Sequence, residues 1–479
     1  AIAFQLKTGN INISGWRNIK SEIEELTELP IRHPSIKNGN NYQPILVTNG
    51  YINENVASRI DGMNDNLVSR GFHPLRTWTG SELLMKFISH TKSFLPQPLP
   101  DFHRLLGFFV KKGDGPLDKE EFDLLLRSIL PVDNSIKSKN KNAIKRYIAS
   151  SAIIVEYALT EYDRNQNYYS KIEAYTMLFC YIRATAIIHK LSEKYWKPTI
   201  DIIEKAINFC VSCLFNDILN QKGFGQGDPR TEAIVSPYRN TLLAGVLSAH
   251  SMWHQFGGPC EWYHDSSDQI HQKICELSSK TKIPSESFVP SHFLACEYLR
   301  QNGKIKLGDK MFLELLNISV LRKQADDKIK PLWNPYLSFE ESILRDLGKR
   351  QESLFSDSYE YETYTALPLI FIAANRLLRH DLELLWYRIS SLNFHEFIPE
   401  SEYQNLYWNN KKGIMSQRFF LQPHKWQSLQ EEAQSISKLP YYLKGYEHWL
   451  PYFLIVYPHR FNPPLVLYLC GLMATLPSS

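Results

Sequence analysis

The stretch AIAFQLKTGN, residues 1–10, decides the fold of the first part of the chain. Its alternating pattern is typical of a strand, in which successive side chains point to opposite faces of the sheet. We therefore expect Ile2, Phe4 and Leu6 to pack on a core, and Gln5 and Lys7 to stand on the open face. A carbonyl oxygen beside an ammonium can help to hold a hard cation and to stabilise a phosphate during its transfer. A half-buried strand with two solvated polar residues is the alternative interpretation.

Alternating helix and strand signals follow this strand as far as about residue 90. Two helices are predicted, the first capped by Ser14 and the second ended by Gly71. Their apolar positions at helical spacing are Trp16, Ile19, Ile23 and Leu26 in the first and Val56, Ile60, Met63 and Leu67 in the second. Strands are predicted at 45–48 and 72–78, and a capping box of Thr79 and Glu82 opens a third helix. Alternation of this kind predicts an α/β unit with parallel strands.

This order of elements resembles the second half of a PD-(D/E)xK restriction-endonuclease domain. The resemblance rests on the Gln-x-Lys strand, on Leu46-Val-Thr-Asn-Gly50 and on Thr79-Gly-x-Glu-Leu83, and it covers residues 1–90. The nearest subtype is Mrr-like, in which Gln can replace the Glu of the motif. The resemblance implies a metal-dependent DNA endonuclease that uses Mg²⁺ or Mn²⁺. It places Gln5 at the second metal-ligand position and Lys7 at the position of the catalytic lysine.

The family also places a metal-binding Asp on a strand before the Gln-x-Lys strand, and no residue of this sequence matches it. We expect that an N-terminal piece with this Asp is missing from the sequence; the alternative is a domain that has lost its chemistry. In the implied mechanism the Asp and Gln5 hold one or two metal ions, and the carbonyl of Leu6 is a further ligand. Lys7 positions the attacking water or stabilises the pentacoordinate phosphate. The rival interpretation is an inactive, nuclease-like subunit that docks DNA or partner proteins.

A proline-rich segment at 94–101, FLPQPLPD, excludes a helix and is interpreted as a linker. Beyond it, long apolar runs predict helices at 120–130, 143–162, 169–196, 198–221, 241–256 and 368–389. The expected fold class is therefore α+β and multidomain, with an α/β restriction-endonuclease-like domain followed by a large, mainly helical region.

The expected domains are a nuclease-like domain at 1–93, the linker, a helical domain at 102–256 and a helical C-terminal domain at 257–479. This architecture resembles bacterial anti-phage and restriction effectors. The resemblance implies that DNA is the substrate and that the helical region senses a trigger or docks partner subunits, including further copies of the chain.

Composition sets broad limits on the function. A net charge of +4 permits nucleic-acid binding but does not by itself imply it. Seven cysteines without regular spacing argue against a disulfide framework and favour a reducing, cytoplasmic location. The apolar stretch 464–476 is too short to span a bilayer, which takes about 20 residues, so we expect a buried helix and no membrane partner.

Three other patterns have a structural explanation that we favour over a chemical one. Cys210 and Cys213 form a CxxC inside an apolar helical run, which indicates helix cysteines rather than a metal site. His250 and His254 stand one helical turn apart, yet the spacing to the next candidate ligands matches no known zinc module; these are Cys260, His264, His271 and Cys275. The glycine-rich 223–227 lacks the lysine of a P-loop and follows a helix, so we interpret it as a loop between helices.

Two basic stretches without acidic residues are candidates for nucleic-acid contact. The first contains Lys137, Lys139, Lys141, Lys145 and Arg146. The second, 404–427, contains Lys411, Lys412, Arg418 and Lys425, interleaved with aromatic residues. Cations with aromatic residues between them suit phosphate neutralisation and base stacking. A solvated loop with aromatic residues facing the core fits the second stretch equally well.

Overall fold

The chain forms two compact units in the computed structural model, Ala1–Pro98 and Leu99–Ser479. The structure describes residues 2–30, 42–83, 85–86, 102–132, 141–220, 229–259, 262–321, 332–348, 362–397, 399, 401–407, 416–419, 426–436 and 438–475. The predicted linker at 94–101 and the glycine-rich 223–227 lie outside these residues.

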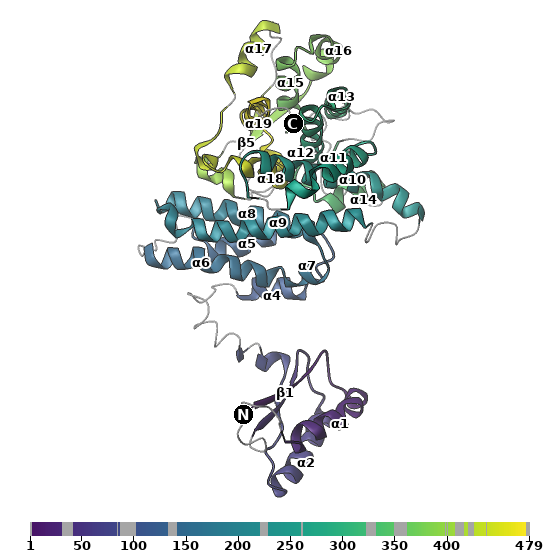
Figure 1. The fold of residues 1–479 in the computed structure, drawn as a ribbon, viewed down its shortest axis with the longest axis vertical. Coiled ribbons are helices and arrows are strands. Elements are labelled where there is room, and N and C mark those ends of the chain that lie inside the picture. Colours follow the sequence, from purple (N-terminus) through teal and green to yellow (C-terminus); the bar gives the residue numbers. More distant parts are fainter. Residues whose placement is uncertain are drawn as a thin grey trace. The chain divides into compact units, whose positions relative to one another are not determined.

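The first unit is built on a three-stranded parallel sheet in the order β1-β2-β3. The strands are β1 (Ile2–Lys7), β2 (Gln43–Thr48) and β3 (Arg76–Trp78), and helices α1 (Ile13–Glu28) and α2 (Glu54–Ser69) connect them (Figure 1). In register, Gln5 pairs with Leu46 and Lys7 with Thr48. The predicted α/β unit with parallel strands is therefore confirmed.

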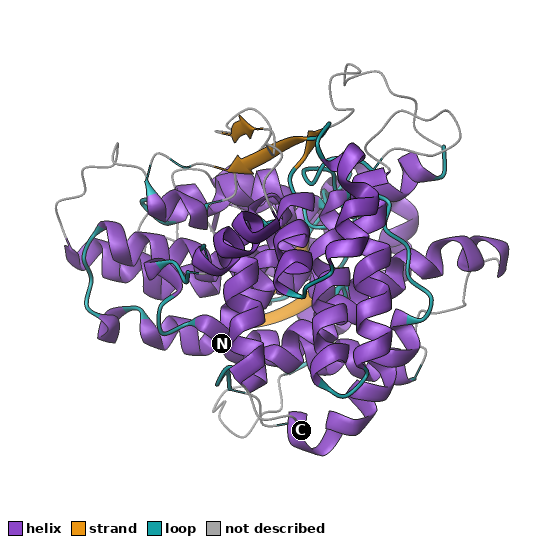
Figure 2. Ribbon diagram, turned by 90° about the horizontal axis from the view of Figure 1, so that it is seen from above, coloured by secondary structure: helices purple, strands orange, loops and turns teal. Residues whose placement is uncertain are grey.

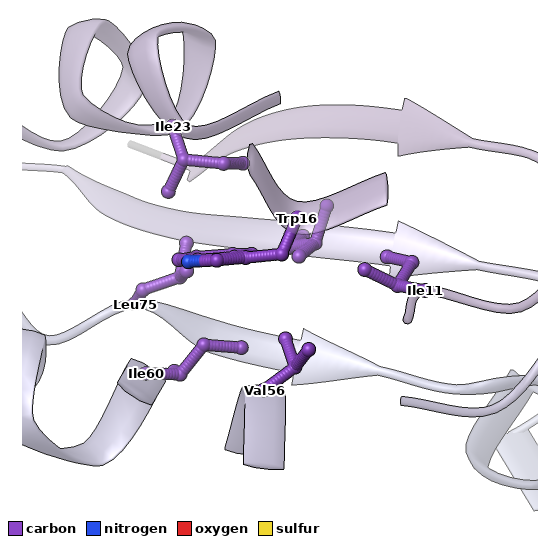
Figure 3. Packing of buried hydrophobic residues seen from close by; sticks show 7 residues of the cluster. Ile11, Trp16, Ile23, Val56, Ile60 and Leu75 are labelled. Carbon is purple, nitrogen blue, oxygen red and sulfur yellow. The ribbon is translucent and has the colours of Figure 1, made fainter. Parts of the chain in front are cut away.

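Both helices pack on the same face of this sheet. Trp16 and Ile23 of α1 and Val56 and Ile60 of α2 are buried in one cluster with Leu46 of β2 (Figure 3). Every apolar helix position that was predicted from spacing is either buried or packed against this cluster. The pattern of burial follows from right-handed crossovers between neighbouring parallel strands, which place successive helices on one side of the sheet.

The boundaries of α1 and α2 show one predicted cap and one unpredicted cap. The N-cap of α1 is Asn12 rather than Ser14, because the Asn12 side chain accepts a hydrogen bond from the Gly15 N–H at 2.8 Å. Gly71 follows α2 with a positive φ of 81°. The next amide, that of Phe72, donates to the Leu67 carbonyl at 2.9 Å, so the predicted glycine stop is confirmed.

The predicted orientation of β1 is wrong. Ile2, Phe4 and Leu6 are exposed, with 71% of Leu6 accessible, and the alternate residues Gln5 and Lys7 face α1. The alternation itself is present, but its two faces are exchanged. The physical reason is that the side of the sheet covered by α1 and α2 is fixed by the crossovers and by Leu46, and Gln5 lies in register with Leu46.

The second unit is mainly helical, with few strands (Figure 2). Its helices are α4 (Phe102–Val110), α5 (Lys119–Ile129), α6 (Lys141–Ala158), α7 (Thr160–Arg164), α8 (Tyr168–Ile188), α9 (Lys197–Leu219), α10 (Pro229–Gln255), α11 (Tyr263–Ser278), α12 (Val289–Gln301), α13 (Ile305–Leu321), α14 (Phe339–Asp346), α15 (Ala366–Asn375), α16 (Arg379–Ile389), α17 (Trp426–Ser435), α18 (Leu450–Val456) and α19 (Pro463–Thr475). A small second sheet consists of β4 (Glu362–Thr363), β5 (Asn393–Phe397) and β6 (Ser416–Phe419). Helix α10 packs against α12, across the predicted domain boundary at 256/257.

Two helices form the centre of this unit. Helix α8 is buried without interruption from Ser170 to Ala186, and α12 from Val289 to Leu299. A helix that is buried on all sides needs its polar groups paired. Accordingly, the Lys119 ammonium lies 2.7 Å from the buried carboxylate of Glu173 in α8. These central helices explain why the long apolar runs carried a strong helical signal.

The run predicted as one helix at 368–389 is two helices. Helix α15 ends at Asn375 and α16 begins at Arg379. Between them Leu377 has a positive φ of 60°, and the Leu378 amide donates to the Ala373 carbonyl at 3.0 Å. This is a left-handed helix stop made without glycine, and it therefore leaves no glycine signal in the sequence.

The late apolar stretch is helix α19, with Leu465, Val466 and Leu469 among its buried residues. The prediction of a buried helix is confirmed. Within the described part of the chain, none of the helices combines the length and the apolar character that a membrane crossing requires.

Candidate active site on the first strand

The two polar side chains of β1 converge on one carboxylate of α1. The Gln5 Nε2 group donates to Glu22 Oε2 at 2.6 Å, and the Lys7 ammonium lies 2.6 Å from the same oxygen. The Lys7 side chain is 25% exposed and that of Glu22 is 46% exposed, so this triad is open to solvent. The structure thus brings together the two predicted site residues and adds a third.

The sequence contained a signal for Glu22 that the predictions did not use. Ile19, Glu22 and Leu26 stand at i, i+3 and i+7, and therefore on one stripe of α1. Ile19 and Leu26 pack against the cluster beneath the helix. A carboxylate on the same stripe is thereby aimed at the sheet, where Gln5 and Lys7 lie.

The donor set of this triad fits a hard divalent cation. Because the Gln5 amide nitrogen donates to Glu22, its carbonyl oxygen is the group left to act as a ligand. A carboxylate and an amide oxygen suit Mg²⁺, which is held by one or two protein oxygens and keeps several water ligands. Among the described residues, no three His, Cys, Asp or Glu side chains are grouped to hold a metal.

The loops at the carboxyl ends of the three strands pack tightly on one another. Asn49 Oδ1 accepts from the Gly9 amide at 2.6 Å, and the Gly80 amide donates to the Gly50 carbonyl at 2.9 Å. A Cβ atom on Gly50 would lie 2.5 Å from the Gly9 carbonyl, so only glycine fits there. Ligands of open α/β sheets bind outside this edge. These contacts therefore hold in place the edge of the sheet where β1 ends, at Lys7. They are made by residues of the motif segments, namely Asn49, Gly50 and Gly80.

The remaining predicted site residues are distributed differently. Leu6 points its side chain away from Glu22, onto the exposed face of β1, and only its backbone belongs to the predicted ligand set. Lys411, Lys412 and Lys425 lie outside the described residues. Arg418 belongs to β6, where its backbone pairs in register with His395.

One aromatic residue of the second basic stretch belongs to the core. Tyr407 is 4% exposed, donates through its hydroxyl to the Val132 carbonyl at 2.8 Å, and stacks on Tyr181. For this residue the core-facing alternative is correct, and base stacking is excluded.

The CxxC segment lies in α9, as predicted. Cys210 is buried, and burial raises the pKa of its thiol to about 12. Cys213 is partly exposed, and both are free thiols. The packing of Cys210 and its apolar neighbours in this helix accounts for the segment.

His250 is a packed histidine. It is 1% exposed, its Nδ1 lies 2.9 Å from the Tyr452 hydroxyl, and its ring stacks on Trp262 at 5.3 Å between centroids. Burial lowers its pKa to about 3, with a further contribution from His254. Cys260 and the side chain of His264 lie outside the described residues.

We expect the purified protein to contain no stoichiometric zinc, because a tetrahedral site needs ligands that converge, and Tyr452 already holds one nitrogen of His250. Elemental analysis of the full chain measures this. One zinc per chain that is lost in the double variant His254→Ala, Cys260→Ala would contradict the prediction.

Comparison of the chain with known protein families, with curated proteins and with solved structures found no match.

Proposed function

We propose that the first unit is part of a metal-dependent DNA endonuclease, with Gln5, Lys7 and Glu22 as its active-site residues. The observation that carries this proposal is the convergence of Gln5 and Lys7 on one Glu22 oxygen, at 2.6 Å each. In the nuclease-like motif, Gln5 stands at the position of a metal ligand and Lys7 at the position of the catalytic lysine. Their convergence places a third group, the Glu22 carboxylate, close to both. A role in restriction or anti-phage defence is proposed from the resemblance in architecture.

In this site the carbonyl oxygen of Gln5 and the carboxylate of Glu22 would hold Mg²⁺ or Mn²⁺. When bound, the metal supplies Lewis-acid stabilisation of the scissile phosphate and lowers the pKa of a water ligand. The Lys7 ammonium orients the attacking water or stabilises the negative charge on the phosphate. Glu22 holds Lys7 in place before substrate binds, and the glycine-rich edge at Gly50 fixes the end of β1.

A second candidate function is a nuclease-like module that only docks DNA or protein. Two observations favour it. Lys7 is already neutralised by Glu22. The opposite face of β1 exposes Phe4, whose ring lies 5.4 Å from that of Trp78. A module of this kind has no use for a bound metal, so the dependence on Mg²⁺ separates the two functions.

The variant Glu22→Gln is expected to raise the Mg²⁺ concentration required for DNA cleavage by about tenfold or more, because the neutral amide is a weaker ligand than a carboxylate. The maximal rate at saturating Mg²⁺ should fall less, since Lys7 remains. Cleavage of plasmid DNA by the full chain over a series of Mg²⁺ concentrations measures both quantities.

Glu24→Gln is the matched control, because Glu24 lies on the same helix and its carboxylate forms an exposed pair with Lys20 at 3.4 Å. It should cleave with the Mg²⁺ dependence of the unaltered chain. Equal Mg²⁺ curves for Glu22→Gln and Glu24→Gln would remove Glu22 from the site. Absence of Mg²⁺-dependent cleavage in the unaltered chain would favour the docking module.

A further inference from the structure

Basic side chains from two segments that are far apart in sequence surround one exposed tyrosine in the helical unit. Tyr195 ends the short 3₁₀ helix Glu193–Tyr195, just before α9, and 37% of it is exposed. The Lys145 ammonium of α6 is 3.7 Å from the centre of its ring, and the Lys194 ammonium is 5.0 Å away. Lys141 lies one helical turn before Lys145 on α6. Lys141, Lys145, Lys194 and Tyr195 are called the Tyr195 cluster below.

The positive charge of the Tyr195 cluster is not neutralised by the described residues around it, where no carboxylate pairs with any of its three lysines. The neighbouring acids have other partners: Glu193 accepts from the Tyr446 hydroxyl at 2.7 Å, and Asp201 pairs with Lys197 at 2.8 Å. Helix α6 begins at Lys141, so the positive end of its dipole lies in the cluster. Hydrogen bonding to Lys145 and Lys194 lowers the pKa of the Tyr195 phenol.

We propose that the Tyr195 cluster binds single-stranded DNA, with the lysines on successive phosphates and a base stacked on the tyrosine ring in place of the Lys145 ammonium, which lies over the ring in the free protein. Lysines act as point charges on phosphates, and exposed rings among cations are the usual elements of a single-strand site. Residues of the first basic stretch are thus joined by Lys194 and Tyr195, which the sequence does not place near them. The choice of DNA as ligand rests on the proposed function, but the site lies in the other unit of the chain.

The test measures binding of a fluorescent single-stranded oligonucleotide of about 20 nucleotides to the full chain, with EDTA present so that no cleavage occurs. The double variant Lys145→Glu, Lys194→Glu should bind at least tenfold more weakly at about 0.1 M salt. The slope of log affinity against log salt should flatten by about 1.4, since each phosphate contact on a single strand contributes about 0.7. The double variant Lys306→Glu, Lys310→Glu carries the same change of charge on α13, and it should leave the slope unchanged.

The ring is tested separately from the charges. Tyr195→Ala should weaken binding about tenfold, as expected for the loss of one base stacked on an aromatic ring. Tyr195→Phe keeps the ring and should bind within about twofold of the unaltered chain. Tyr195 is exposed and does not belong to the buried core.

An unchanged salt slope in the Lys145→Glu, Lys194→Glu variant would overturn the proposal, as would equal losses for Tyr195→Phe and Tyr195→Ala. Loss of binding to anionic phosphatidylserine vesicles, without loss of binding to the oligonucleotide, would assign the cluster to a membrane surface and would also overturn it. If the cluster variants contradict the binding predictions while the unaltered chain cleaves DNA, only the proposal for the Tyr195 cluster fails and the proposed function stands. Cluster-dependent binding without any Mg²⁺-dependent cleavage refutes the endonuclease alone.

Discussion

The variant Lys7→Ala should lose at least about 100-fold of the Mg²⁺-dependent DNA cleavage, which is the typical cost of removing one group that stabilises charge in a transition state. The fold should survive, because the pair between Lys7 and Glu22 is partly exposed, at 25% and 46% of the side chains. Pairs of this kind contribute about 1 kcal/mol or less to stability. Single-turnover cleavage at saturating Mg²⁺ measures the loss, and circular dichroism confirms the fold.

Lys20→Ala is the matched control, since it removes an equal charge from the exposed side of α1, where Lys20 pairs with Glu24. It should cleave at the rate of the unaltered chain. Full cleavage by Lys7→Ala at saturating Mg²⁺ would refute the mechanism. Equal losses in both lysine variants would show that the net charge of the unit, and not the position of Lys7, controls the rate.

The sequence predicted the elements of the first unit better than the direction in which one strand faces. Helical spacing identified the apolar stripes of α1 and α2, because a helix that packs on a sheet must bury a continuous stripe. For β1, alternation alone cannot say which face is covered. That depends on the helices, and Leu46 in the neighbouring strand settles it through its register with Gln5. Gln5 and Lys7 were thus predicted as a pair, whereas Glu22 was missed.

In the helical unit, the sequence predicted long buried helices but not their breaks or their contacts across the chain. The stop at Leu377 has a positive φ without glycine, and so leaves no local signal. The Tyr195 cluster joins α6 to a residue about 50 positions away, which no pattern of spacing can reveal. For His250 the sequence favoured packing over metal binding, and the structure shows it buried at 1% exposure; the burial of His292 carried no signal that the predictions used.

Buried neutral histidines should make the helical unit sensitive to acid. Burial lowers the pKa of His250 to about 3 and that of His292 to about 4, against an ordinary value of 6.5. Below pH 6.5 the unfolded chain binds protons at these residues and the folded chain does not, so the free energy of unfolding falls as the pH falls. Each histidine costs up to about 1.4 kcal/mol per pH unit, and the two together cost about 3 kcal/mol between pH 6.5 and pH 5, since each is only half protonated in the unfolded chain at pH 6.5.

Two buried carboxyl groups act in the opposite direction. Burial raises the pKa of Asp123 and of Glu173, so the folded chain takes up these protons at a higher pH than the unfolded chain does. Their contribution to stability therefore increases as the pH falls through the folded pKa. The histidine effect must for this reason be isolated by comparing variants rather than read from the total pH dependence.

The variant His292→Leu, which keeps an apolar group of similar size in α12, should lose about 2 kcal/mol less stability than the unaltered chain between pH 6.5 and pH 5. His380→Leu on α16 is the control, because it makes the same substitution at an exposed histidine. Urea unfolding of the full chain, followed by circular dichroism at both pH values, gives the two differences. Parallel curves for His292→Leu and the unaltered chain would show that His292 takes up its proton equally in the folded and unfolded states, and that its burial does not carry the acid sensitivity.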